Sequence, residues 1–168
     1  MFRLISLVFA ALLTAACSSV PEQLEVAEDV TLVSYEQNTA DTAAITQGQA
    51  RWGGRIISVT NSQDSTIIDL LHQELNNSGR PIIEDKSKGR FRIYIQGYLE
   101  PVIYQPGRLI TALGELSQKE QSTVGSHKIS LPVIYASEIH LWPDYKEKET
   151  EFVYVPYVVH RPIYIKSP

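Results

Sequence analysis

Alternation of apolar and polar side chains is the clearest pattern in this chain, and it is strongest over residues 91–96. This stretch reads Phe-Arg-Ile-Tyr-Ile-Gln, so every second side chain is apolar. A period of two is that of a half-buried β-strand. Weaker versions of the pattern predict further strands over residues 51–61, 109–116 and 132–142. Residues 66–75 fit both strand spacing and helix spacing.

The predicted strand over residues 51–61 carries two adjacent glycines near its start. Gly53 and Gly54 weaken a flat strand, and they predict a bulge or a sharp bend, as at the corner of a barrel. Strict alternation along the same strand places Ile57 and Val59 on one face. It places Trp52 and Ile56 on the other face, and we expect Trp52 to be a core residue.

Turn sequences between the strands indicate how the chain is connected. Runs rich in Asn, Ser, Gly and Pro separate the strands, and the polar residues 117–121 predict a loop before the last strand. Residues 30–33 fit a short strand, and residues 43–49 fit a single helical turn. These features predict a mainly β protein, specifically a small five- to six-stranded OB-like β-barrel.

A cationic start and an apolar run precede all of the predicted strands. Arg3 is followed by an unbroken apolar stretch over residues 4–13, then by small residues and by Cys17, the only cysteine. This is the layout of a secretory signal. The apolar stretch is too short to span a bilayer, which takes about 20 residues. We therefore expect residues 1–16 to be removed and the remainder to be exported.

The residues up to Cys17 predict lipidation in addition to export. The sequence Leu13-Thr-Ala-Ala-Cys17 resembles a bacterial lipobox, with Leu13 one position further from the cysteine than usual. A lone thiol is unusual in an oxidising envelope. We therefore interpret Cys17 as the site of an S-diacylglycerol and of an N-acyl chain such as palmitate. The alternative is an ordinary signal peptide with an incidental cysteine. Ser18, where an Asp tends to retain lipoproteins at the inner membrane, is typical of an outer-membrane destination.

Composition predicts the domain boundaries. Residues 17–48 are acidic, small and polar, and we expect a lipid anchor followed by a solvated tether. Residues 49–142 form the predicted barrel. Residues 143–168 form a proline-interrupted C-terminal extension that is expected to pack on the edge of the domain. The formal net charge is −4, yet residues 51–108 carry eight basic and six acidic side chains, so positive charge gathers in the middle.

Several short segments follow one another along the chain in an order that is typical of one family. They are Arg51-Trp-Gly-Gly-Arg-Ile-Ile-Ser-Val-Thr-Asn61, Gly79-Arg-Pro81, Gly89-Arg-Phe91, Gly97-Tyr-Leu-Glu-Pro101, Pro106-Gly-Arg-Leu-Ile-Thr111 and Leu131-Pro-Val133. The ordered set resembles the Slp family of outer-membrane lipoproteins, named for its starvation-inducible members. The resemblance implies an envelope location and, through Ile68-Asp69-Leu70, a strand up to about His72. It implies no ligand and no reaction.

Motifs of common catalytic chemistry do not occur in the sequence. There is no hydrolase nucleophile elbow, no phosphate-binding loop and no dinucleotide fingerprint. His72, His127, His140 and His160 show no paired spacing, so we expect scattered surface or edge histidines rather than a zinc site. The prediction is a non-enzyme with no metal and no cofactor beyond the lipid on Cys17.

One group of residues suits ligand binding. Arg90, Arg92 and Tyr94 alternate along the predicted strand, and with Arg108 they are candidates for a binding face of the barrel. The alternative is a solvated outer face, where such alternation is normal. A net negative charge and an exported location argue against nucleic acid, so we expect an anionic glycan or lipid as the ligand.

Taken together, these features predict a lipid-anchored outer-membrane protein that faces the periplasm. Its expected role is structural or accessory, in maintenance of the envelope under stress. Two alternatives remain: a ligand-binding module for an envelope glycan or lipid, and a partner of an envelope assembly that docks along residues 152–165.

Overall fold

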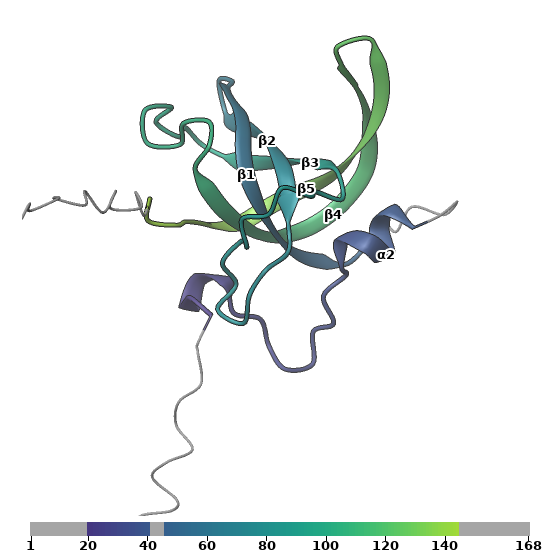
Figure 1. The fold of residues 1–168 in the computed structure, drawn as a ribbon. Helices are drawn as coiled ribbons and strands as arrows, with labels where there is room; N and C mark the ends of the chain where they lie inside the picture. The colour runs from purple at the N-terminus through teal and green to yellow at the C-terminus, as the bar shows by residue number, and fades with distance from the viewer. Residues whose placement is uncertain (1–19, 41–45, 145–168) are drawn as a thin grey trace, which may run out of the picture.

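Five strands hold most of residues 49–141 in the computed structural model, which describes residues 20–40 and 46–144. The strands close into a barrel in the order β1-β2-β3-β5-β4, with β4 against β1 (Figure 1). β3 and β5 run parallel, and the other neighbours are antiparallel. This is the strand order of the OB fold, so the predicted OB-like barrel is confirmed. The elements are η2 (Glu22–Leu24), α2 (Tyr35–Thr39), β1 (Gln49–Asn61), β2 (Ser65–Gln73), β3 (Arg90–Gln96), β4 (Leu109–Val124) and β5 (His127–Leu141).

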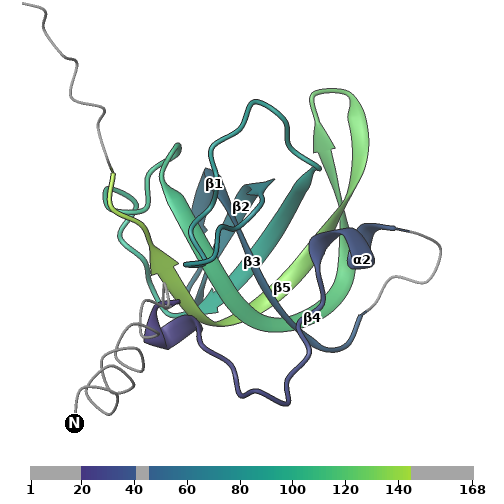
Figure 2. The same cartoon turned by 60° about the horizontal axis from the view of Figure 1, so that its bottom comes forward.

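The same alternation that predicts β3 also fills the barrel. Phe91 and Ile93 of β3 have no exposed surface, and the register sets them opposite Leu70 and Ile68 of β2, which are equally buried. Trp52 of β1 joins this core, as expected, with its ring edge-on to Phe91 at 5.6 Å between centroids. The strands curve around this core (Figure 2), and removal of its apolar surface from water stabilises the closed barrel.

β1 departs from strict alternation in the middle. Its pairing with β2 shifts register between Ile56 and Ser58. Ile56 is buried, and Val59 packs partly buried against the same core cluster. The prediction that Ile56 and Val59 lie on opposite faces was therefore wrong. A bulge adds one residue and reverses the parity of every side chain that follows it.

Gly53 and Gly54 lie where β1 is shared between two neighbours. Residues 53–55 pair with β2 on one edge and with β4 on the other. An added Cβ at Gly54 would lie 2.1 Å from the Leu71 carbonyl oxygen, so only glycine fits this close approach. The predicted bend is thus a point of tight strand contact, and the bulge of β1 lies further along the strand.

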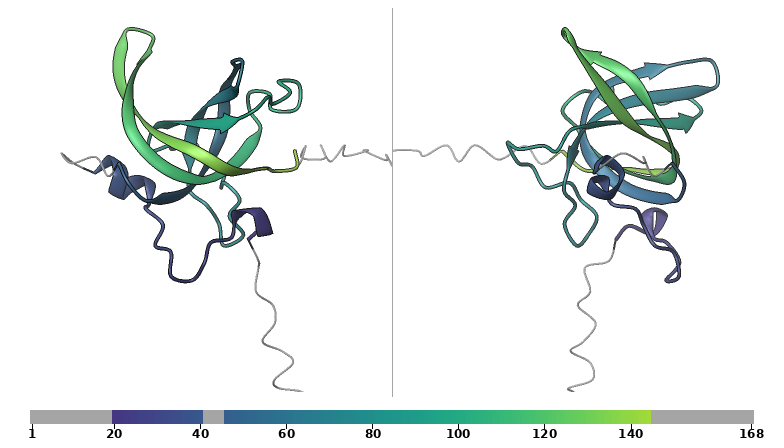
Figure 3. Two further views of the ribbon diagram at one scale, coloured as in Figure 1. Left: turned by 180° about the vertical axis from the view of Figure 1, so that it is seen from behind. Right: turned by 90° about the vertical axis from the view of Figure 1, so that its right-hand side faces the viewer.

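β4 and β5 continue past the barrel as a long hairpin, the β4–β5 arm (residues 117–131), which stands out in Figures 1 and 3. The predicted loop over residues 117–121 was wrong, because β4 runs on to Val124 and the turn contains Gly125 at φ +59°. Pairing of β4 with β5 extends to the very end of the hairpin. Residues 117–123 of this ribbon are all polar and none of them is buried, so in the sequence they resemble a loop.

The described part of the expected tether packs on the barrel. Leu24 is completely buried, and its carbonyl accepts a hydrogen bond of 3.0 Å from Arg51 Nη1. The Trp52 indole donates to the Val33 carbonyl at 2.9 Å. The expectation of a solvated spacer was therefore wrong for residues 20–40. It overlooked that a few apolar side chains within an acidic segment suffice to cover one end of a barrel.

Two local predictions in this segment also change. Residues 30–33 form no strand, and residues 46–49 lead directly into β1 rather than into a helical turn. The helix α2 was not predicted, although Ser34 and Gln37 form a capping box, in which each side chain bonds to the other residue's backbone N–H.

Leu24→Ala is expected to lower the free energy of unfolding by about 2–5 kcal/mol, the usual cost of a cavity at a fully buried leucine. Leu24 packs with Leu109, Leu113 and Trp142 at the end of the barrel, so the loss falls on the barrel itself. Urea denaturation measures it. Val102→Ala, at a side chain that is 78% exposed, is the control and should change stability by less than about 0.5 kcal/mol. Equal stability of the two variants would contradict the docking of residues 20–40.

Some predicted segments lie wholly or partly outside the described residues, among them residues 17–19 and 41–45 of the tether, the latter with the start of the predicted helical turn. Three others carry the main predictions about the ends of the chain. They are the signal (residues 1–16), the lipidation site Cys17 and the C-terminal extension, of which Pro143 and Asp144 are described. Within residues 20–40 and 46–144, no helix has both the length and the apolar character needed to cross a membrane.

Candidate functional site on the outer face of β2 and β3

Arg92 of β3 points outward and forms the centre of an ionic network. The register of β2 and β3 sets Asp69 directly opposite Arg92. The guanidinium binds this carboxylate in a bidentate manner, with Nε at 2.7 Å from Oδ1 and Nη2 at 3.0 Å from Oδ2. Such a paired geometry is among the stronger hydrogen-bonded contacts in proteins.

A second carboxylate reaches Arg92 from the β4–β5 arm. Glu120 Oε2 lies 2.7 Å from Arg92 Nη1, and Glu120 Oε1 accepts a hydrogen bond of 2.8 Å from the Tyr94 hydroxyl. The Tyr94 ring stacks on that of Tyr135, with centroids 5.2 Å apart. The hydrogen bond to Asp69 is the main cause that raises the pKa of Arg92, and burial, followed by Glu120, raises the pKa of Tyr94. Two carboxylates therefore neutralise the one arginine.

Arg108 is not part of this network. It lies just before β4, a strand that pairs with β1 and β5. Its guanidinium donates to two backbone carbonyls, that of Trp142 at 3.0 Å and that of Ile103 at 3.3 Å. The structure thus brings Arg92 and Tyr94 together and sets Arg108 apart, holding a loop to the end of β5.

Arg90 borders a groove that we call the α2 groove. Its volume is about 510 Å³, and it runs between α2, the segment before β3 and the β4–β5 arm. The Tyr35 hydroxyl of α2 donates to the Arg90 carbonyl at 3.1 Å and so holds the helix to β3. Apolar and cationic side chains share the lining, which includes Tyr35, Leu71, Lys88, Arg90, Ile129 and Leu131.

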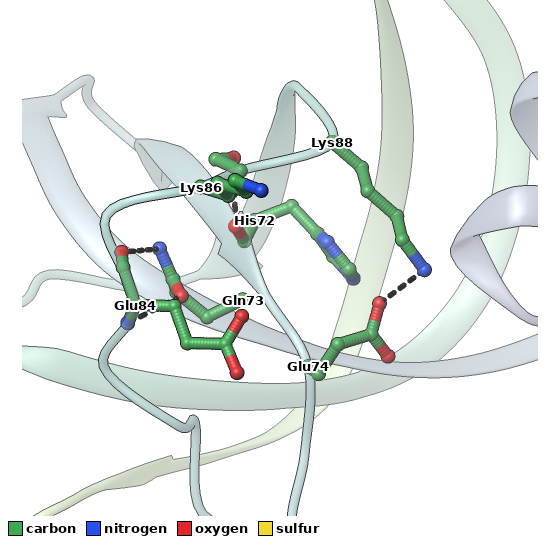
Figure 4. Close-up of a pocket in the computed structure, with 7 residues that line it drawn as sticks. His72, Gln73, Glu74, Glu84, Lys86 and Lys88 are labelled. Carbon is green, nitrogen blue, oxygen red and sulfur yellow. Dashed lines mark hydrogen bonds and ion pairs between the residues drawn. The ribbon is translucent and has the colours of Figure 1, made fainter.

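His72 lies at the inner end of a smaller pocket of about 280 Å³ (Figure 4). It is only 4% exposed and stacks on Tyr35 at 4.0 Å between centroids, so the prediction of a surface or edge histidine was wrong for this residue. Burial lowers the pKa of His72. Lys88 bonds to both Glu36 and Glu74 beside it, and its hydrogen bond is the main cause that lowers the pKa of Glu36 to about 2.

The remaining described histidines show no shared site. His140 packs edge-on against Trp142 at 4.3 Å, and its Nδ1 lies 2.6 Å from Gln23 Nε2. His127 lies at the tip of the β4–β5 arm. Within the described ranges, His, Cys, Asp and Glu side chains form no group of three or more that could hold a metal ion.

The carboxylates of the Arg92 network were missed by reasoning from the sequence. Asp69 could have been found, because pairing of the two strands leaves it opposite Arg92. Glu120 gave no signal, since the residues around it read as a loop. The pattern of charges alone therefore shows a cationic face, while the structure shows an ion-paired one.

Comparison with known proteins adds the identity of the chain. The profile of the Outer membrane lipoprotein Slp family matches residues 14–168. The chain belongs to this family. The match begins ahead of Cys17 and extends through the whole barrel, so the resemblance drawn from the ordered motifs is confirmed.

Relatives of this Slp-family chain include two proteins of Escherichia coli K12. The uncharacterized lipoprotein YeaY is 23% identical over 132 residues, which are 79% of this chain and 68% of that protein. Outer membrane protein Slp is 26% identical over 131 residues, 77% of this chain and 69% of that protein. An uncharacterized protein of Haemophilus influenzae is 29% identical over 127 residues, 75% of this chain and 68% of that protein.

Among solved structures, the Plasmodium falciparum SSB complex with ssDNA has a TM-score of 0.31 to this Slp-family chain at 15% identity. The likeness covers 61% of this chain and 99% of that one.

Proposed function

We propose that this Slp-family protein is anchored in the outer membrane through lipids on Cys17, faces the periplasm, and has a structural or accessory role in the envelope under stress. The observation that carries the proposal is the family match, which joins the lipobox-like segment and the barrel in one unit. Outer membrane protein Slp of Escherichia coli, with which the chain aligns over 77% of its length, supports the location.

The chemistry of Cys17 suits an anchor. A thiolate accepts a diacylglycerol as a thioether, and the amino group freed by signal cleavage accepts a third acyl chain. Each buried CH₂ contributes about 0.8 kcal/mol, and two or more chains suffice for stable attachment. Ser18 and Ser19 follow the cysteine in the sequence without adding charge to the anchor.

Ion pairs within the barrel support a non-catalytic role. Arg92 is held by Asp69 and Glu120, and Lys88 is held by Glu36 and Glu74. Each pairing joins elements that are distant in sequence, so these charges serve to fasten the arm and α2 to the barrel. A group held in this way is poorly suited to exchange protons during catalysis, since its charged state is stabilised by its partners.

A second candidate function is capture of an anionic glycan or lipid, and the α2 groove favours it. Arg90 lies at a groove of about 510 Å³ whose other walls are largely apolar, a composition that suits an amphipathic anion. Lys88 also lines the groove, but Glu36 and Glu74 already pair with it, so Arg90 is the cation that the proposal uses. The Arg92 face is less suitable, because its arginine already carries two carboxylates. Docking of a protein along residues 152–165 concerns a segment outside the described residues.

Mass spectrometry of the mature N-terminus, together with separation of the two membranes, tests the main proposal. The expected result is a chain that begins at Cys17, carries three acyl chains and sediments with the outer membrane. Protease added to intact cells should leave the barrel uncut, and it should cut the barrel once the outer membrane is permeabilised. An unacylated Cys17 or an inner-membrane location would contradict the proposal.

Arg90→Gln is expected to weaken binding of lipopolysaccharide, used as an anionic glycolipid probe, by at least about tenfold if the α2 groove captures such ligands. The reason is loss of a charge-assisted hydrogen bond of about 1.5–3 kcal/mol. Arg92→Gln is the matched control on the same strand and should leave the affinity unchanged. Fluorescence titration with the purified domain measures both. Equal affinities of wild type and Arg90→Gln would reject the groove as a binding site.

A further inference from the structure

The anchor and the barrel are separated by a very short stretch of chain. Cys17 precedes Val20 by three residues, and Val20 already packs on the barrel against the cluster around Leu24. Three residues span at most about 11 Å, even when fully extended. If Cys17 is acylated, which this inference takes from the proposed function, the end of the barrel that carries Val20 lies at the bilayer surface.

The segment after Val20 is packed against the barrel, so it cannot extend to increase the distance between the barrel and the bilayer. Leu24 is completely buried, and Arg51 holds its carbonyl. Gln23 contacts His140 of β5 at 2.6 Å. Residues 20–24 are thus fixed to β1, β4 and β5. The distance between lipid and barrel is therefore set by residues 17–19 alone.

The loop between β2 and β3 lies at the same end of the barrel. Gly79, in this loop, is so close to Val20 that an added Cβ would lie 3.4 Å from a Val20 methyl group. Figures 1 and 3 show η2 beside this loop, at the end of the molecule opposite the β1–β2 hairpin and the β4–β5 arm. A bilayer that holds Cys17 therefore faces this loop.

Two large apolar side chains of this loop are exposed to solvent. Ile82 is 40% exposed and Ile83 is 64% exposed, and they follow Gly79 by three and four residues. In water, the apolar surface of these two isoleucines stays hydrated. Transfer of this surface to the region where the acyl chains begin is favourable. We propose that the end of the barrel formed by η2 and residues 74–89 rests on the bilayer, with Ile82 and Ile83 in the membrane interface.

Charges at this end limit how deep the contact goes. Glu84 and Asp85 follow Ile83 directly and are exposed, as are Glu25 and Glu28 after η2. Transfer of a charged carboxylate from water into hydrocarbon is strongly unfavourable, and anionic headgroups repel carboxylates. They suit the ammonium groups of a zwitterionic lipid such as phosphatidylethanolamine. Exposed Lys86 and Lys88 lie in the same loop, so this end carries charges of both signs, and the contact is therefore shallow.

This orientation leaves the far end of the barrel free for other molecules. The β1–β2 hairpin and the β4–β5 arm lie at the end of the barrel opposite η2 (Figure 1), and therefore away from the proposed bilayer. The loop over residues 97–108 also starts there, since Gly97 N–H donates to the Asp64 carbonyl of the β1–β2 turn. Its exposed Val102 and Ile103 therefore provide an internal reference that the bilayer should not reach.

Single-cysteine labelling of the acylated protein tests the orientation. The chain has one cysteine, and acylation consumes it, so a new thiol is labelled selectively. Ile83→Cys and Val102→Cys are each labelled with an environment-sensitive fluorophore, nitrobenzoxadiazole, and reconstituted in vesicles of phosphatidylethanolamine and phosphatidylglycerol. The expected result at position 83 is a fluorescence increase of at least about twofold and quenching by spin-labelled lipid. At position 102 neither change is expected.

Cosedimentation with the vesicles, measured on the same samples, separates the two proposals. The orientation would be overturned, with the anchor left intact, if the protein sediments with the vesicles but the label at position 83 reports the same aqueous environment as the label at position 102. Protein that fails to sediment would reject the acylated anchor, and the orientation with it. Because Ile83 is mostly exposed, its replacement should not unfold the barrel, and thermal unfolding by circular dichroism checks this for both variants.

Discussion

Cys17→Ser is expected to remove the protein from the outer membrane. Serine has no thiolate to accept the diacylglycerol, so the signal is not processed by the lipoprotein route and no acyl chain is added. The anchor would lose every CH₂ that contributes about 0.8 kcal/mol of membrane affinity. The uncut precursor should retain the apolar run over residues 4–13 and accumulate apart from the outer membrane. Fractionation on a sucrose gradient and the mass of the chain measure both effects.

Ser18→Ala is the matched control for this variant, since it changes a neighbouring hydroxyl and leaves the thiol in place. It should be acylated and should reach the outer membrane as the wild type does. The Cys17→Ser domain, purified without its signal, should unfold at the wild-type temperature, because residue 17 lies ahead of the packed segment that starts at Val20. Outer-membrane attachment of Cys17→Ser at the wild-type level would refute the anchor.

Gly54→Ala is expected to destabilise the barrel by about 3 kcal/mol or more, at the upper end of the cost of overpacking. The new methyl group would lie 2.1 Å from the Leu71 carbonyl oxygen and 2.9 Å from its carbon. Both atoms belong to the backbone of β2, so no side chain can turn away. The β1–β2 pairing must open to make room. Gly114→Ala should act in the same way, because its Cβ would lie 2.1 Å from the Tyr135 carbonyl oxygen.

Gly107→Ala separates this effect from the ordinary cost of replacing glycine. Gly107 has φ +94°, yet nothing lies within 4 Å of its Cβ position. Alanine at this position should lower the free energy of unfolding by about 1–2 kcal/mol, through the unfavourable backbone conformation alone. Urea denaturation of the three variants gives the comparison. If Gly54→Ala costs no more than Gly107→Ala, the close contact of β1 with β2 is not a constraint on the fold.

The acidic N-terminal segment packs on the barrel, which its composition does not predict. Reasoning from composition treats Glu22, Glu25 and Glu28 as the charges of a solvated tether. In the structure, Leu24 lies between them and fills the end of the barrel. Hydropathy averaged over a window loses this information, since one leucine among several acids hardly changes the mean. The stability of this contact depends on that single side chain and on the cluster of Leu109, Leu113 and Trp142 against which it packs.

The candidate binding face shows a similar difference between pattern and structure. Alternation correctly sets Arg92 and Tyr94 on one side of β3, away from buried Phe91 and Ile93. It does not show that Glu120, 28 residues further along the chain, folds over to bond both of them. Whether an arginine is free to bind a ligand depends on such distant partners. The binding face on Arg92 therefore remains a prediction, with less support than the α2 groove.

The sequence by itself determined the strand β3 and its buried face, because burial on one side imposes a period of two that is kept along the whole strand. In β5 a register shift breaks this period. It also determined the family, because the ordered motifs are local sequence, and it predicts the signal and the lipid on Cys17. Only the tertiary structure decided what covers the end of the barrel, where the β4–β5 arm stands and which charges are paired. Those features depend on contacts between residues far apart in the chain. No local pattern records them, because each partner alone looks like an ordinary solvated residue.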